Sequence, residues 1–317
     1  MATAFVCIVS VAAIAATTGA DATARSAKGE GPTSIVAAFG SIWIGTGSGA
    51  VIRIDARTMR LQRVHRGRGF VHSLARGYGA VWALQDHVVR IHPKRGQATV
   101  LSDTGSATTF ELAVGAGAVW VADDGRDVVD RIDPRLTERT ATIRIPGRAV
   151  GLAAGHEHAL VVSVPTRGRV TGPAGIRLLR RLDPHANRVS PPLVRLECDP
   201  GIAITRDATW TTDPCAGTLV RRDPKTLAAT GARRVGRWRA PVAGFGSIWL
   251  IGQRSVTRVD PETLRVIARI PAGGSVATVG EGAVWLLECW GCDNTVIHRI
   301  DPGANRVVAT IRVPSSS

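Results

Sequence analysis

The apolar and polar positions of this chain alternate in short segments of the kind that form β-strands. The stretch from Glu111 to Pro146 is the clearest example, because four brief runs rich in β-branched and small apolar residues are each bounded by Gly, Pro or Asp. These runs are 112–114, 118–122, 128–132 and 140–145. Runs of this length between turn-forming residues predict four antiparallel strands joined by tight turns.

Two landmarks show that this four-strand unit is repeated. The Trp of a G-x-G-A-V-W element, or its nearest variant, occurs at Trp43, Trp82, Trp120, Trp210, Trp249 and Trp285, with Leu160 in the one missing place. An Asp-Pro turn with two variants recurs in phase at Asp55-Ala56, His92-Pro93, Asp133-Pro134, Asp183-Pro184, Asp223-Pro224, Asp260-Pro261 and Asp301-Pro302. The chain therefore contains seven copies of a repeat of roughly forty residues.

Four strands per repeat predict the fold class: all-β, a seven-bladed β-propeller of four-stranded antiparallel blades. Helical solenoids of similar period need two amphipathic helices per repeat, and the sequence shows none. The propeller is expected over residues 34–317, with units near 34–70, 71–109, 110–149, 150–199, 200–239, 240–274 and 275–317. Each blade is expected to be self-contained, unless Lys28 to Thr33 adds a piece.

The repeated residues are best explained as scaffold. The Trp series is suited to filling the wedges between blades, and an Asp before Pro can accept hydrogen bonds from its own turn. An Arg stands two residues before each turn position, at Arg53, Arg90, Arg131, Arg181, Arg221, Arg258 and Arg299. A spacing of two places Arg and Asp on one face of a strand, so an Arg–carboxylate pair is geometrically available. A ring of functional arginines is the alternative.

The N-terminus has the pattern of an export signal. The apolar run Ala4 to Ala16 precedes the A-x-A sequence Ala20-Asp21-Ala22, which predicts a signal peptide over 1–22 and a linker over 23–33. The run is short for a bilayer span, so we expect a secreted or cell-envelope protein without a transmembrane span in the mature chain. No Lys or Arg precedes the run, so an uncleaved anchor or a misassigned start codon stays open.

The chain has a formal net charge of +15, almost all of the excess from Arg. A basic surface attracts nucleic acid, anionic lipid or acidic polymers. Here the arginines are distributed over all repeats instead of clustering with aromatic residues, and no nucleic-acid motif is present. We therefore do not expect nucleic acid as a partner, and we expect a monomer. A specific polyanion site is the alternative.

Four cysteines follow the predicted signal: Cys198, Cys215, Cys289 and Cys292. In an exported protein an even number of cysteines favours disulfides. Cys198 lies in the connection into the fifth unit and Cys215 in a loop of that unit on the same face, so the two can meet. Cys289 and Cys292 would close a very small ring. A metal site and a redox-active CxxC are the alternatives.

The fourth unit departs most from the repeat. It has lost its Trp, and a loop from Pro165 to Gly175 extends it on the face that also carries the cysteines. Insertions confined to one face of a repeat array often mark a binding face. We expect Arg167 and Arg169 of this loop, together with Trp290 of the CxxC loop, to take part in binding. A neutral surface insertion is the alternative.

The unit G-x-G-A-V-W-V-A, followed by R-I-D-P and a closing T-I-R-I-P, resembles the YVTN-type and streptogramin (virginiamycin B) lyase-like propellers from Ser34 to Val313. The resemblance implies seven blades. It is specific for the architecture and not for an activity, because such propellers include lyases, lactonases, NHL-type interaction modules and exported proteins of unknown role.

A lyase of that family would imply a His, Glu and His set near a divalent metal at the central axis. Glu288 resembles the family's W-F-T-E position, while His72 and Glu111 stand at inner-strand entrances of blades two and three. The set is incomplete, because the corresponding entrances of blades five to seven carry Gly201, Ala240 and Val276.

Two other clusters are weaker candidates for a metal. His156-Glu157-His158 falls in a first turn, on the face opposite the axial site. Asp123, Asp124 and Asp127 match no calcium-loop spacing. We therefore assign no metal site.

Two functions remain in view. The favoured one is an exported, non-catalytic propeller that binds a protein, a glycan or an acidic envelope polymer through its loop-rich face, without a cofactor. The alternative is a metal-dependent carbon–oxygen lyase or a lactonase acting at the central axis, with Mg²⁺ or Ca²⁺ as cofactor.

Overall fold

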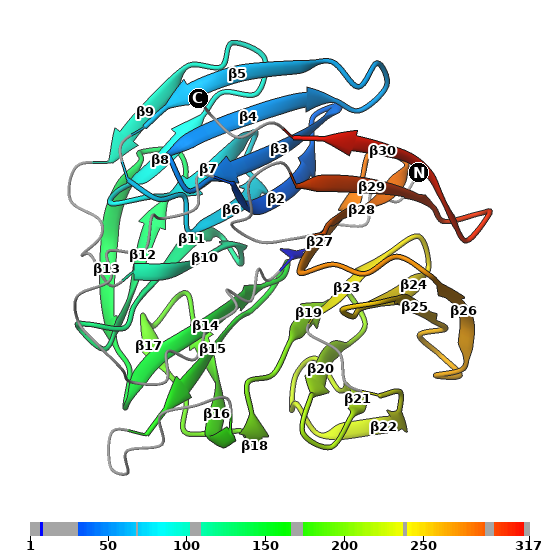
Figure 1. Cartoon of the computed structure of the whole chain (residues 1–317). Helices are drawn as coiled ribbons and strands as arrows, with labels where there is room; N and C mark the ends of the chain where they lie inside the picture. Colours follow the sequence, from blue (N-terminus) through cyan, green and yellow to red (C-terminus); the bar gives the residue numbers. More distant parts are fainter. Residues whose placement is uncertain are drawn as a thin grey trace, which may run out of the picture.

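The computed structural model describes residues 7–8, 31–67, 69–101, 109–165, 174–236, 240–288 and 295–313. All regular elements in these ranges are strands, and they form seven antiparallel sheets arranged as blades around an axis (Figure 1). The predicted seven-bladed, four-stranded propeller is confirmed. The described residues include no helix with the length and apolar character needed to cross a membrane.

Each blade is built from consecutive strands. Blade 1 contains β2 (Pro32–Ala38), β3 (Ser41–Thr46), β4 (Ala50–Asp55) and β5 (Leu61–Arg66). Blade 2 contains β6 (Ser73–Gly77), β7 (Ala80–Leu84), β8 (Val88–Ile91) and β9 (Ala98–Leu101). Blade 3 contains β10 (Thr109–Gly115), β11 (Ala118–Asp123), β12 (Val128–Asp133) and β13 (Glu138–Arg144).

Blade 4 has an interrupted outer strand. It contains β14 (Arg148–Ala154), β15 (Ala159–Val164), β16 (Ala174–Asp183), β17 (Arg188–Val189) and β18 (Val194–Cys198). Both β17 and β18 pair with β16. Pro191 and Pro192 lie between them. Proline has no N–H to donate to the sheet, which explains the break.

The last three blades have the regular form. Blade 5 contains β19 (Ile202–Ile204), β20 (Thr209–Asp213), β21 (Thr218–Arg222) and β22 (Ala229–Arg234). Blade 6 contains β23 (Ala240–Gly244), β24 (Ser247–Ile251), β25 (Val256–Val259) and β26 (Val266–Ile270). Blade 7 contains β27 (Val276–Gly280), β28 (Ala283–Leu287), β29 (Val296–Asp301) and β30 (Arg306–Arg312). The two-residue β1 (Cys7–Ile8), inside the predicted signal, pairs with β19.

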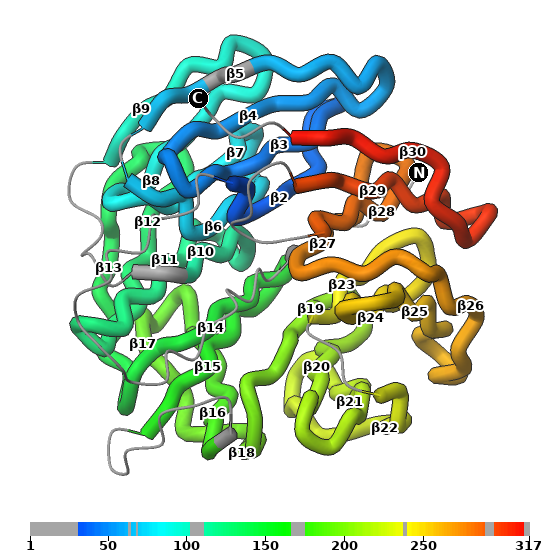
Figure 2. Tube along the Cα trace, viewed as in Figure 1, coloured from blue at the N-terminus to red at the C-terminus, as the bar shows by residue number. Residues whose placement is uncertain are grey.

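Among the described residues, every blade takes its four main strands from one continuous stretch of chain, and blade 5 gains the two-residue β1 at its inner edge. The Cα tube runs once around the axis, and the last blade comes to lie beside the first (Figure 2). At this closure the backbone N–H of Ala37 in β2 donates to the Thr278 hydroxyl in β27, at 3.1 Å. The described residues of blades 1 and 7 therefore meet through apolar packing and this hydrogen bond.

The strand order gives the propeller two different faces. The turns between the first and second strands, and between the third and fourth strands, lie at one edge of every blade, which we call the turn face. The loops between the second and third strands, and the connections to the next blade, lie at the opposite edge, which we call the loop face.

The core consists of seven apolar clusters, one in each seam between neighbouring blades. Six of the seams contain one fully buried Trp of the repeat, at Trp43, Trp82, Trp120, Trp210, Trp249 and Trp285. Each indole N–H donates to the residue five positions earlier, as in the bond from Trp43 to the Ala38 carbonyl at 3.0 Å. The seam between blades 4 and 5 has Leu160 instead.

The repeated Asp organises the turn after the third strand, as predicted. In blade 6 the Asp260 carboxylate accepts hydrogen bonds from the backbone N–H groups of Glu262 and Thr263 and from the Thr263 hydroxyl. Such bonds favour the charged form and lower the pKa of Asp55, Asp133, Asp183, Asp223, Asp260 and Asp301. In blade 2 the Nδ1 atom of His92 accepts the equivalent bonds from Lys94 and Arg95.

The repeated Arg and the turn Asp do not form the close ion pair that their spacing makes available. No ion pair within 4.0 Å joins them among the described residues. The Arg53 guanidinium instead lies over the Trp43 ring, with 5.4 Å from its carbon to the ring centroid, and donates to the Pro93 carbonyl of the next blade at 3.1 Å. Arg181 reaches the next blade in the same way. The side chain therefore spans the seam and donates to backbone carbonyl groups of the neighbouring turn.

Candidate functional site

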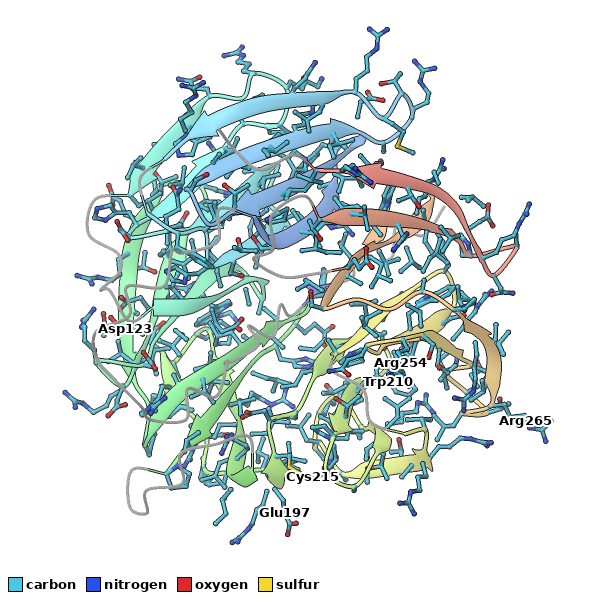
Figure 3. The ribbon with its side chains drawn as sticks, in the orientation of Figure 1. Asp123, Glu197, Trp210, Cys215, Arg254 and Arg265 are labelled. Carbon is cyan, nitrogen blue, oxygen red and sulfur yellow. A yellow bond between two sulfur atoms is a disulfide. The ribbon has the colours of Figure 1, made fainter. Side chains whose placement is uncertain are left out.

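A disulfide joins Cys198 and Cys215 on the loop face, so this predicted pair is confirmed. Cys198 ends β18 of blade 4, and Cys215 stands in the loop that follows β20 of blade 5. Asp213 shapes that loop, because its carboxylate accepts hydrogen bonds from the backbone N–H groups of Cys215 and Ala216. Figure 3 shows Cys215 beside Glu197, the neighbour of Cys198. The bond therefore fastens two blades together.

An ion pair reinforces the same junction. Arg177 of β16 is almost fully buried, and its Nε atom donates to the carboxylate of Asp199, the residue after Cys198. A buried guanidinium needs a charged or hydrogen-bonding partner, which Asp199 supplies. The connection between blades 4 and 5 is thus held by a covalent bond and by a charged hydrogen bond.

The loop of blade 3 between β11 and β12 presents alternating charges on the loop face. Arg126 lies 3.6 Å from the Asp123 carboxylate and 3.5 Å from that of Asp130, and Arg148 lies 3.4 Å from that of Asp124. Burial raises the pKa of Asp124; Arg148 opposes this shift, while Asp123 and Asp127 add to it. Asp123 and Asp130 are buried, so their ion pairs hold the exposed Arg126 in place, and the pair of Asp124 with Arg148 ties this loop to blade 4.

The described residues contain one group of three metal-ligand side chains whose ligand atoms lie within 4.8 Å of one another: Cys198, Asp213 and Cys215. Its two sulfur atoms are joined as a disulfide, so neither cysteine is a thiolate that could bind a metal ion. Asp123, Asp124 and Asp127 do not come together in this way.

The three candidate catalytic residues belong to three different blades. His72 precedes β6 and packs its ring 5.0 Å from that of Phe70. Glu111 is buried on β10, opposite Ala122. Glu288 follows β28 with 55% of its side chain exposed, and its carboxylate lies 3.8 Å from Nε2 of His298.

The remaining candidates fall partly outside the described residues. Arg167, Arg169, Trp290, Cys289 and Cys292 all lie there. The segment His156-Glu157-His158 forms the turn between β14 and β15 and so belongs to the turn face, as expected.

Sequence reasoning missed a buried polar seam between blades 4 and 5. His158 of blade 4 lies 3.5 Å from the Thr209 hydroxyl of blade 5, and burial, helped by the charge of Arg181 and opposed by Glu157, lowers its pKa to about 4. Arg222 is also buried there; it donates to the Thr211 hydroxyl at 2.9 Å, and burial lowers its pKa.

A signal for this seam was present in the repeat. The residue after the repeated Arg is Arg222 in blade 5, whereas the other six copies carry an apolar residue there, at Ile54, Ile91, Ile132, Leu182, Val259 and Ile300.

Neither protein-family profiles nor curated protein sequences match this chain. Solved structures do match its fold. Hydrazine synthase from Kuenenia stuttgartiensis aligns with 13% identity and a TM-score of 0.57, covering 94% of this chain and 100% of that one. The computationally designed Ika8 protein aligns with 11% identity and a TM-score of 0.62, covering 91% and 89%.

A chain of the mitotic checkpoint complex aligns with 9% identity and a TM-score of 0.63, covering 80% of this chain and 85% of its own length. At such identities the likeness concerns the fold alone. Together with the seven sheets, it establishes this chain as a seven-bladed β-propeller.

Proposed function

We propose that this chain is an exported, non-catalytic β-propeller that binds a partner through its loop face. The observation that supports the proposal is that two groups of residues lie in different parts of the molecule. The residues shared by the repeats pack the seams and shape the turns, whereas the disulfide, the ion pair of Arg177 and the charged loop of blade 3 collect on the loop face. Residues that depart from a repeat while holding loops in place are typical of binding surfaces.

The partner class we propose is a protein, a glycan or an acidic envelope polymer. Propellers commonly serve as interaction modules, and one structural neighbour belongs to an assembly, the mitotic checkpoint complex. The Cys198–Cys215 disulfide supports an oxidising environment outside the cytosol. We further propose that the chain belongs with the YVTN-type and streptogramin lyase-like propellers, as one of their non-catalytic members.

The binding proposal is tested with purified chain on an array of glycans and secreted proteins. Arg148 is exposed on the loop face, so Arg148→Glu should weaken binding of the true partner by roughly tenfold. Arg265→Glu is the matched control, since Arg265 is exposed at the outer rim of the turn face and the charge change is identical (Figure 3). Equal effects of the two variants would contradict a loop-face site.

The lyase or lactonase alternative has a separate test. It requires His72, Glu111 and Glu288 to act around a divalent metal. Stoichiometric Mg²⁺, Mn²⁺ or Ca²⁺ that is lost in Glu288→Gln, together with ring opening of a cyclic depsipeptide or lactone, would replace the binding proposal by the enzymatic one.

A further inference from the structure

We propose that the turn face of blades 1 and 2 carries a second binding site, for an acidic polysaccharide. This site is independent of the function proposed for the loop face. It is a cluster of exposed residues that we call the basic–aromatic sector, consisting of Phe39, Arg57, Arg60, Tyr78, Lys94 and Arg95.

The two aromatic residues of the sector have positive φ angles, a backbone conformation that Asn, Asp and Gly adopt more easily. Phe39 and Tyr78 begin the two-residue turns after the first strands of blades 1 and 2, with φ of 56° and 51°, and each is followed by a Gly with φ of 72°. Turns with two positive φ angles favour Asn, Asp or Gly, because a bulky side chain crowds the backbone there. Local folding therefore gives no reason for an aromatic ring at either position.

The two rings are also exposed. Phe39 is 43% exposed and Tyr78 is 42% exposed. A Cβ atom placed on the neighbouring Gly40 or Gly79 would meet no heavy atom within 4 Å, so the surface beside each ring is open at the glycine. Exposed aromatic rings at strained turn tips are available to a ligand.

Four cations lie on the same edge of these two blades. Arg57 and Arg60 are exposed in the second turn of blade 1, and the backbone N–H of Ala56 in that turn donates to the Gly40 carbonyl at 3.0 Å. Lys94 and Arg95 are exposed in the corresponding turn of blade 2. The first-turn aromatics and the second-turn cations therefore belong to one continuous surface.

The sector has few negative charges to balance these cations. In blade 2 the turn Asp of the repeat is replaced by His92, whose Nδ1 accepts hydrogen bonds from the backbone N–H groups of Lys94 and Arg95 at 3.3 and 3.2 Å. This turn therefore contains no carboxylate. In blade 1 the Asp55 carboxylate remains, but one of its oxygens accepts three hydrogen bonds within its own turn.

A further arginine links the two aromatic turns at their inner side. Nη1 of Arg76 in β6 donates to the Ala37 carbonyl in β2 at 2.6 Å. The same atom lies 3.3 Å from the position that a Cβ on Gly280 of blade 7 would take. Because Ala37 and Arg76 stand two residues before Phe39 and Tyr78, this bond holds the two turns in a fixed relation.

Blade 6 offers a contrast within the same molecule. Phe245 also begins a two-residue turn, with φ of 51° and 42% exposure. The second turn of that blade, however, carries Asp260 and the exposed Glu262. The exposed Arg265 of this turn corresponds to Arg60 of blade 1, but the two acidic residues outweigh its charge. Phe245 is therefore an aromatic turn tip beside a turn without net positive charge, and it serves as an internal control for the sector.

The chemistry of the sector fits a polymer of acidic sugars. The faces of aromatic rings attract the weakly positive C–H groups of a pyranose, and Arg and Lys pair with carboxylate or sulfate groups along the chain. Stacking rings and cations also suit single-stranded nucleic acid. The Cys198–Cys215 disulfide favours an oxidising extracytoplasmic compartment, where acidic polysaccharides are available as ligands.

The test measures binding of heparin, polygalacturonate, neutral dextran and a single-stranded oligothymidine to the purified full chain at about 0.15 M NaCl. We expect at least one of the two acidic polysaccharides to bind saturably, and dextran not to bind. The double variant Phe39→Asn/Tyr78→Asn should raise the Kd for that acidic polysaccharide at least roughly tenfold, without any change in the net charge of the protein. Asn suits a positive φ, so this variant should unfold at the same temperature as the original chain or at a higher one.

Two further variants separate the site from unspecific attraction to a basic protein. Lys94→Ser/Arg95→Ser should weaken binding and reduce its salt dependence, whereas Phe245→Asn should change the Kd by less than about twofold. The proposal is overturned if neither acidic polysaccharide binds, if Phe245→Asn weakens binding as much as the sector variant, or if the oligothymidine binds more tightly than both polysaccharides. The loop-face variant Arg148→Glu should leave this binding unchanged, so the two proposals can fail separately.

Discussion

Two seams of the propeller, between blades 6 and 7 and between blades 4 and 5, are built on different principles. In the seam between blades 6 and 7, Trp249 is fully buried among aliphatic side chains of both blades. Arg258 lies over its ring at 5.0 Å and donates to Pro302 and Asn305 of the next blade. Apolar packing fills the interior of this seam, and a polar clamp closes it at the turn face.

The seam between blades 4 and 5 replaces much of this packing with polar groups. Leu160 stands in the place of the Trp, and blade 5 contributes Thr209, Thr211 and Arg222. Buried polar groups add stability only when they are hydrogen-bonded, and they bury less apolar surface than the residues they replace. This is also the seam that the Cys198–Cys215 disulfide crosses.

The difference shows how a ring of blades, each built from four consecutive main strands, is stabilised. Every seam must hold, because opening any one of them opens the ring. We infer that the disulfide compensates for the reduced apolar packing of the polar seam. The covalent bond then belongs to the architecture as well as to the loop face.

The largest effect on the free energy of unfolding is expected from removing the buried Trp of a regular seam. Trp249→Ala should lower the free energy of unfolding by about 4 kcal/mol, because it removes a fully buried ring and leaves a cavity. Leu160→Ala in the polar seam should cost about 2 kcal/mol, since it removes less apolar volume. Urea unfolding of both variants measures this. Equal losses would mean that the two seams are packed equally well.

Removing the disulfide should have the next largest effect. The bond joins residues 17 positions apart, and opening a loop of this size costs about 3 kcal/mol. Cys198→Ser/Cys215→Ser should therefore unfold at a lower urea concentration than the original chain. Cys289→Ser/Cys292→Ser is the control, because any ring closed by those two cysteines is much shorter and should contribute less. A larger loss in the control would contradict the assignment of the main covalent link to the polar seam.

Much of the fold was predictable because the same pattern of strands and turns occurs seven times in the sequence. The Trp and Asp-Pro landmarks gave the blade count, and the apolar runs of the third unit matched β10 to β13 closely. The pairing of Cys198 with Cys215 followed from propeller topology, which places both on one face. These features depend on strand order alone.

Other features depend on contacts between blades, which a single repeat does not contain. The spacing of Arg and Asp indicated a partner within one strand, but Arg53 uses a carbonyl of the next blade. The polar seam was visible as Thr209 and Arg222 in apolar columns of the repeat, yet its position required knowing which strand faces pack together. The basic–aromatic sector required the positive φ of its turns.

Acid should weaken the polar seam specifically. Burial lowers the folded-state pKa of His158 to about 4, below its ordinary value of 6.5, so the unfolded chain binds this proton more readily. The stabilising contribution is complete above pH 6.5 and is lost as the pH falls from 6.5 towards 4. The loss is about 3 kcal/mol over the whole window.

Urea unfolding at pH 7 and pH 4.5 measures this loss. His158→Gln should flatten the pH dependence across the window. The exposed His185→Gln should leave it as steep as in the original chain. If the slope is unchanged in His158→Gln, the polar seam does not contain the titrating group.

The smallest expected effect concerns the clamp at the turn face. Arg258→Gln removes the contact with the Trp249 ring and the bonds to the next blade, and should cost about 1–2 kcal/mol. Arg131→Gln is the matched change in blade 3, where the Arg donates to Thr140 of its own blade, and it should cost under about 1 kcal/mol. Urea unfolding at pH 7 compares them. An equal or larger loss for Arg131→Gln would show that the repeated Arg acts within its blade and that regular seams depend on apolar packing alone.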